Sequence, residues 1–123
     1  MTQLFKLLAK CQKARLAGIE GDSATSLSEL NEMIATENSD KKLVFAHLYN
    51  ALGALHQKDS NWKEARTAYL HTDLLFATES ELHAEALFHL SKIWAKLDET
   101  DRAAAARDTL KSRYRNSYCA GKL

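Results

Sequence analysis

Five histidines are the side chains in this sequence that could hold a metal ion or act as a base. Two imidazoles reach one ion from a single helix when they follow an H-x3-H or an H-E-x-x-H spacing, and neither spacing occurs. His83 and His89 stand six residues apart, which places them on different faces of a helix. The sequence therefore predicts no metal site and no cofactor. The five are His47, His56, His71, His83 and His89.

Nucleophilic chemistry has no better support, because no motif brings a reactive side chain to a base. Cys11 and Cys119 lie at opposite ends of the chain, which predicts two free thiols rather than a disulfide framework. There is no Gly-rich phosphate loop and no G-x-S-x-G turn. The carboxylates near Glu32 and near Glu81 are typical of solvated helix faces. We therefore expect a protein that is not an enzyme.

The composition restricts the remaining classes of function. A chain of 123 residues predicts one domain, residues 1–123, with a sizeable core. Seventeen basic and 16 acidic residues give a net charge of +1, so the basic excess of a nucleic-acid-binding protein is missing. No apolar run approaches the ~18 residues of a membrane span, so we expect no membrane insertion. Lysines interrupt the apolar runs of residues 1–18, which argues against a signal peptide and favours a cytoplasmic protein.

The stretch from Tyr49 to Tyr69 predicts two antiparallel helices separated by a polar break at residues 58–61. Gly53 on the first helix and Ala65 on the second supply the clearance that a close crossing needs. Large side chains fill the volume on either side of these small residues. They are Tyr49, Leu52, Trp62 and Tyr69. Such a pair buries its apolar face on one side only, so it needs a neighbouring pair.

A second copy of the pattern begins at Leu87. Leu87, Leu90, Ser91 and Trp94 stand where Tyr49, Leu52, Gly53 and His56 stood. The gap from Ser91 to Ala103 equals the gap from Gly53 to Ala65. Equal gaps in both copies indicate an internal repeat rather than unrelated helices.

These residues resemble the tetratricopeptide repeat (TPR) family, whose pattern is W-x2-L-G-x2-Y, then A-x3-F, then P. The first copy reads Tyr49-x2-Leu52-Gly53-x2-His56, then Ala65-x3-Tyr69. The second copy departs from the pattern, with Arg107 in place of the aromatic residue and Arg115 in place of proline. The period is also longer than the family's roughly 34 residues. The resemblance implies a right-handed stack of antiparallel helix pairs that binds proteins or peptides and is not an enzyme.

We therefore expect an all-α helix-pair solenoid of three pairs. Residues 2–37 form a divergent first pair, in which Gly18 and Gly21 end the first helix. Residues 41–77 form the best-matching repeat, and residues 79–115 form a degenerate last repeat. Residues 116–123 form a loosely ordered tail. The absence of proline lets the helices run without interruption.

In such a stack the first helix of each pair faces the concave groove, and its exposed stripe is the candidate binding site. We predict that the groove binds a peptide or protein segment as an adaptor or scaffold module. Asn50 contacts the peptide backbone, Lys92 and Lys96 contact an acidic group, and Phe88 is an exposed apolar anchor. An ordinary solvated face is the other interpretation of this stripe. The predicted groove residues are His47, Asn50, Gln57, Lys58, Glu85, Phe88, His89, Lys92 and Lys96.

Self-assembly is the alternative function. The last helix carries four consecutive alanines, and its outer face is not clearly polar. Leu110, Tyr114 and Tyr118 could therefore stack on another copy and build a homo-oligomer or a larger complex. The sequence leaves both functions open.

Overall fold

The computed structural model describes residues 2–123, and Met1, which belongs to the expected domain, lies outside the described residues. These residues form six α-helices and one short 3-10 helix and contain no strand, which confirms the all-α prediction. The elements are α1 (Thr2–Glu20), α2 (Ser23–Thr36), α3 (Lys42–Lys58), α4 (Trp62–Leu75), α5 (Ser80–Lys96), α6 (Thr100–Arg113) and η1 (Ala120–Lys122).

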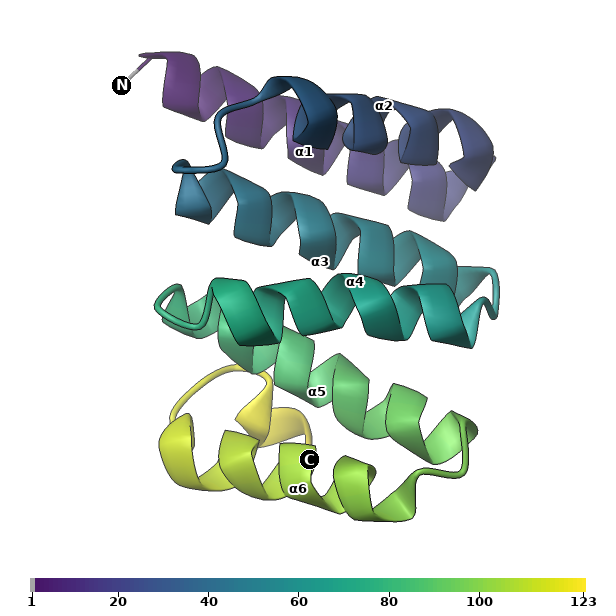
Figure 1. Cartoon of the computed structure of the whole chain (residues 1–123), viewed down its shortest axis with the longest axis vertical. Coiled ribbons are helices and arrows are strands. Elements are labelled where there is room, and N and C mark those ends of the chain that lie inside the picture. Colours follow the sequence, from purple (N-terminus) through teal and green to yellow (C-terminus); the bar gives the residue numbers. More distant parts are fainter. Residues whose placement is uncertain (1) are drawn as a thin grey trace.

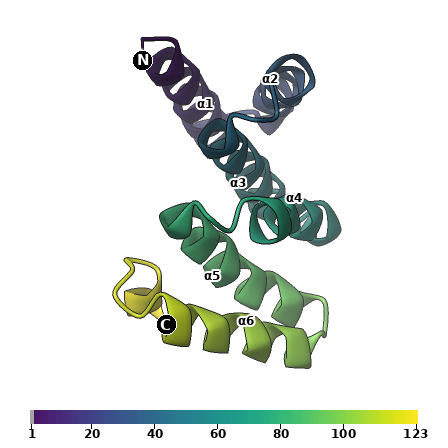
Figure 2. The same ribbon diagram turned by 60° about the vertical axis from the view of Figure 1, so that its left-hand side comes forward.

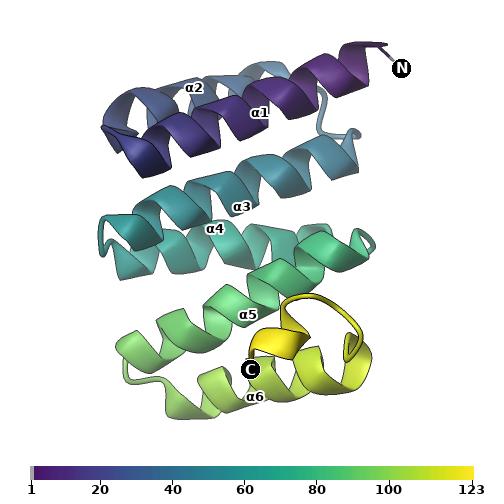
Figure 3. The same cartoon turned by 180° about the vertical axis from the view of Figure 1, so that it is seen from behind.

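The helices lie in two layers. Helices α1, α3 and α5 form the first layer, and α2, α4 and α6 form the second layer, as Figures 1 and 3 show from opposite sides. Each helix packs against the next one along the chain, and α1 also packs against α3, and α3 against α5. The segment after α6 turns back towards the first layer, on the side away from α2 and α4 (Figure 2).

The first helix is longer than expected, because Gly18 does not end it. Helix α1 continues through Gly18 to Glu20. Gly18 is buried, and a Cβ atom at this position would lie 2.6 Å from a methyl group of Leu55. This glycine therefore lets α1 approach α3 closely, and the expectation that it breaks the helix was wrong.

The pairs α3–α4 and α5–α6 follow the same backbone course at a constant offset along the chain. Helix α5 begins at Ser80 and α3 begins at Lys42. The offset in residue number between these two starts also separates the ends of the two helices. The same shift relates both bounds of α4 to those of α6. Just beyond α3 and α5, Ser60 and Asp98 adopt the left-handed conformation with φ of 60° and 61°. We call two residues separated by this shift counterparts.

The same course continues past α6. The amide of Glu79 donates to the carbonyl oxygen of Phe76 (3.0 Å) in the turn after α4. Their counterparts repeat this bond after α6, where the amide of Ser117 donates to the carbonyl oxygen of Tyr114 (2.8 Å). Residues 117–123, which we call the C-terminal segment, therefore leave α6 in the way that the chain leaves α4 to begin α5.

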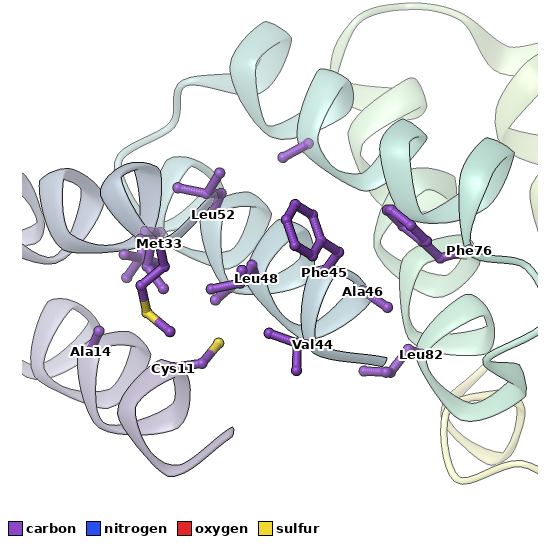
Figure 4. Packing of buried hydrophobic residues seen from close by; sticks show 14 residues of the cluster. Cys11, Ala14, Met33, Val44, Phe45, Ala46, Leu48, Leu52, Phe76 and Leu82 are labelled. Atoms are coloured by element: carbon purple, nitrogen blue, oxygen red, sulfur yellow. The ribbon is translucent and has the colours of Figure 1, made fainter. Parts of the chain in front are cut away.

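Two clusters of buried apolar side chains hold the helices together. The first lies between α1, α2 and α3 and extends to Phe76 and Leu82 at the turn between α4 and α5 (Figure 4). Cys11 points into this cluster, and burial raises the pKa of its thiol to about 11. The second cluster lies between α4, α5 and α6, where Ile93 and Leu110 are fully buried. Since Leu110 is inaccessible, it cannot contact another copy as the self-assembly hypothesis expected.

Candidate functional site

A cavity of about 640 Å³ opens on the first layer. Arg15 of α1 and His47 of α3 line one side of it, and the first half of α5 lines the centre. The C-terminal segment supplies the opposite wall with Tyr118, Cys119 and Lys122. Four of the predicted groove residues meet in this cavity. They are His47, Glu85, Phe88 and His89.

Asn50 is the centre of a polar network behind the cavity. Its side-chain amide donates to the carbonyl oxygen of Leu82 (3.0 Å) and to Oε1 of Glu85 (2.9 Å), and its Oδ1 accepts from the Thr72 hydroxyl (2.7 Å). Arg15 donates to Oε2 of the same carboxylate (2.6 Å). The network thus joins α1, α3, α4 and α5.

This network corrects one prediction, because Asn50 is fully buried and cannot contact a peptide backbone in a groove. Helix α5 covers this position, and its Leu82 carbonyl and Glu85 carboxylate accept the hydrogen bonds of the Asn50 amide. Burying an amide is stable only when its hydrogen bonds are satisfied, which the network achieves. Asn50 therefore fixes the back of the site rather than its binding surface.

The charges of the network are matched inside the protein. Burial alone opposes the negative charge of Glu85, but the Arg15 guanidinium and the hydrogen bonds from Arg15 and Asn50 outweigh this effect. The pKa of Glu85 is consequently below its ordinary value. Sequence reasoning missed Arg15, although its position on the apolar stripe of α1, four residues after Cys11, is a usable signal. A charged side chain on such a stripe needs a buried partner.

Two histidines give the cavity its neutral polar surface. His89 stacks on Tyr69 with ring centres 5.0 Å apart and meets Phe88 edge-on at 5.2 Å. Burial lowers the pKa of His89 to about 4, against the opposing attraction of Glu85. Burial also lowers the pKa of His47. Both imidazoles are therefore neutral at pH 7.

The C-terminal segment is folded onto α5, which corrects the expectation of a loosely ordered tail. Cys119 and Ala120 pack against the second apolar cluster. The Lys122 ammonium lies 5.8 Å from the centre of the Phe88 ring, and Phe88 is only 7% exposed. Phe88 is therefore not the exposed anchor that the sequence predicted, because this segment and α5 itself cover the ring.

The remaining predicted groove residues lie outside the cavity. The Lys58 ammonium donates to the carbonyl oxygens of Gly18 (2.7 Å) and Gly21 (2.6 Å), so it closes the end of α1. Gln57 is half-buried near the end of α3. The Lys92 ammonium lies 4.9 Å from the centre of the Phe88 ring, at the edge of the site. Lys96 instead lies over Trp62 of α4, at 5.7 Å.

Most of the predicted core residues are buried. Tyr49, Trp62 and Ala103 are only half-buried. Gly53 lies against Tyr69, because a Cβ atom at this glycine would come within 2.5 Å of the Tyr69 ring. The buried members of the predicted set are Leu52, Gly53, Ala65, Tyr69, Leu90 and Trp94.

A second network of hydrogen-bonded polar side chains, which sequence reasoning missed, joins α4, α5 and α6. His83 is 3% exposed, and its Nε2 and Nδ1 lie 2.6 Å from Oδ1 of Asp73 and 2.6 Å from the Tyr114 hydroxyl. Since the carboxylate can only accept, Nε2–H donates to Asp73, and Nδ1 shares the second hydrogen bond with the Tyr114 hydroxyl. The counterparts of His83 and Tyr114 are Phe45 and Phe76. Polar side chains at positions that are apolar in the other pair were the sequence signal for this buried polar group.

The cavity of the first layer is lined by neutral polar, charged and aromatic side chains. Within residues 2–123, no three side chains of the metal-binding types gather closely enough to hold an ion. None of the helices described combines the length and the hydropathy that a bilayer crossing requires. No protein-family model, curated protein or solved structure matches this chain.

Proposed function

We propose that the chain is a TPR-like helical repeat protein, with three helix pairs stacked into a right-handed superhelix. The constant offset between the bounds of α3–α4 and those of α5–α6 supports a repeated unit. The left-handed residue after α3 and again after α5 supports the same unit. The close contact between Gly53 and Tyr69 agrees with the small residue that the family pattern requires at a helix crossing.

The proposed function is the binding of a protein or peptide segment, without catalysis, on the face of the first layer. The cavity of about 640 Å³ is the observation that carries this proposal. Its volume falls in the range of roughly 300–1,000 Å³ that is usual for small-molecule and cofactor sites. Elements far apart in the sequence build it, so its shape depends on the whole stack.

The lining of the cavity favours a polypeptide partner. Arg15 and Glu85 already satisfy each other, and the buried imidazoles are neutral, so the back of the cavity carries little free charge. Glu81 and Lys122 line the cavity, are exposed, and offer charges of both signs. Neutral polar groups surrounded by separate charges suit a peptide, which presents amides and mixed side chains.

Affinity capture from a lysate of the source organism tests this function. The charge reversal Glu81→Lys at the edge of the cavity should abolish capture of the partner, because rim charges steer and orient association. The matched control is Glu32→Lys, an exposed glutamate on α2, which should leave capture unchanged. Equal capture by all three proteins would show that the partner does not use the cavity.

Self-assembly remains the second candidate because α1 has an exposed apolar stripe. Phe5, Leu16 and Ile19 are 62%, 57% and 41% exposed and lie on one face of the helix. Contiguous exposed apolar side chains are a common sign of an interface. Light scattering at high protein concentration should then give a dimer that Leu16→Lys dissociates. A monomer at every concentration would remove this candidate.

A further inference from the structure

Trp94 of α5 lies in the second apolar cluster, between α4, α5 and α6. Its side chain is only 7% exposed. The guanidinium carbons of Arg66 on α4 and Arg102 on α6 lie 5.5 Å and 5.1 Å from its ring centre. Two cations thus lie close to the indole, whose π system attracts positive charge.

The counterpart of Trp94 is His56 on α3, where the same backbone course carries a much smaller ring. A cavity of about 330 Å³ lies beside His56. The cavity is bounded by α3 and by the exposed side of α4. We attribute this space to the smaller size of the His56 ring, because the larger indole of Trp94 stands at the corresponding position of the next pair.

The walls of this cavity have the chemistry that an aromatic ring needs. Tyr49 and His71 both line the cavity and stack face to face, with ring centres 4.2 Å apart and planes 2° apart, so this aromatic stack forms one wall. Lys63 supplies a cation at the edge, as Arg66 and Arg102 do for Trp94. The Glu64 carboxylate lines the same cavity and is an acceptor for a ring N–H group.

We propose that the cavity beside His56 binds an indole group, either as a free small molecule or as a tryptophan side chain. The ring lies against the Tyr49–His71 wall with Lys63 near its face, and Glu64 accepts the ring N–H. The site is on another part of the surface than the cavity of the first layer and shares no lining residue with it. The proposal therefore stands independently of peptide binding.

The test is an NMR titration of the full chain with indole and, separately, with N-acetyl-tryptophanamide. We expect saturable shifts for the amides around His56 and His71. Binding of both probes identifies a site that accepts a tryptophan side chain, and binding of indole alone identifies a small-molecule site. No saturable binding of either probe would overturn the proposal.

Variants locate the binding and use the repeat as an internal control. Thr67→Phe, at an exposed position on the cavity wall, should weaken indole binding at least about tenfold. Ala105→Phe places the same ring at the exposed counterpart on α6 and should leave the affinity unchanged. An equal effect of both variants, or no effect of Thr67→Phe, would contradict the assigned site.

Three further variants sharpen the assignment. His56→Trp should fill the cavity with the protein's own indole and abolish binding of the probe. Trp94→His should create a second indole site between α4 and α6. Lys63→Ala should weaken binding about twofold to fivefold, the usual effect of losing one exposed cation–π contact. If His56→Trp folds with unchanged indole affinity, the cavity beside His56 is not the site.

Discussion

The pairs α3–α4 and α5–α6 have the same backbone course but different contents. The pair α3–α4 buries Asn50 and Thr72, which are hydrogen-bonded to each other. Their counterparts in α5–α6 are the apolar residues Phe88 and Leu110. Helix α5 covers Asn50 and accepts both hydrogen bonds of its amide, whereas the short C-terminal segment lies over the counterpart Phe88. The comparison teaches that the element packed on a given position decides whether this position holds a polar network or a buried apolar side chain.

The substitution Asn50→Leu should be the most destabilising test of this comparison. It removes three hydrogen bonds and leaves the Leu82 carbonyl and one oxygen of Glu85 without their donor. We expect the free energy of unfolding to fall by about 3 kcal/mol, as for a buried polar network that loses one member. Urea denaturation measures the change. Asn31→Leu, on the exposed face of α2, is the control and should change stability by less than about 0.5 kcal/mol.

Gly53→Ala should have the next largest effect. The new methyl group would meet the Tyr69 ring at 2.5 Å, and the ring cannot move freely because His89 stacks on it. Overpacking of this kind costs about 2 kcal/mol. At the counterpart position, Ser91→Ala removes only a hydrogen bond to the Phe88 carbonyl oxygen and should cost about 1 kcal/mol or less. Similar losses in thermal denaturation at both positions would mean that α3 and α4 are not closely packed.

Mild acid should destabilise the protein through His89, whose counterpart is the apolar Ala51. Because the pKa of His89 is lowered to about 4 in the folded state, the unfolded chain binds its proton first as the pH falls. This contribution to stability is complete above about pH 6.5 and is lost progressively towards pH 4. We expect a loss of about 1–2 kcal/mol between pH 7 and pH 5.

The variant His89→Gln isolates this effect. It should flatten the dependence of the free energy of unfolding on pH in that interval, with a smaller slope left by His47, whose pKa is also lowered. Urea denaturation of both proteins at several pH values provides the measurement. A slope as steep as in the wild type would assign the acid sensitivity to other groups.

Ser60→Gly and Asp98→Gly should give the smallest effects, and both should be stabilising. Each residue sits just beyond a helix in the left-handed region, with φ near 60°, where glycine avoids a steric penalty. We expect a gain of about 0.5–1 kcal/mol at each position. Equal gains in melting experiments would support the equivalence of the two turns, and a loss at either site would show a side-chain role there.

The helices were predictable because their signals are local. Apolar periodicity and the polar breaks near Asn61 and Asp98 indicate where helices end, and the observed bounds differ from the expected ones by a few residues. The close crossing of α3 and α4 was predictable because such a crossing needs a small residue, and Gly53 provides one.

The site was only partly predictable, because its composition depends on contacts between distant parts of the chain. Arg15 and Glu85 are 70 residues apart, so no local pattern pairs them. Burial of Asn50 depends on α5, and burial of Phe88 depends on a segment whose fold has no periodic signal. The stripe on one helix gives the candidates, and the neighbouring elements decide which of them remain accessible.

The bond between Arg15 and Glu85 has a consequence for how the protein unfolds. In repeat proteins each unit usually contacts only its neighbours, so the ends of the stack fray independently. Here the guanidinium of the first pair reaches Glu85 of the third pair at 2.6 Å, and Asn50 of the middle pair donates to the same carboxylate. Such a contact links the two ends of the chain, so opening of α1 also disturbs α5. The three pairs should therefore melt as one cooperative unit rather than from their ends inward.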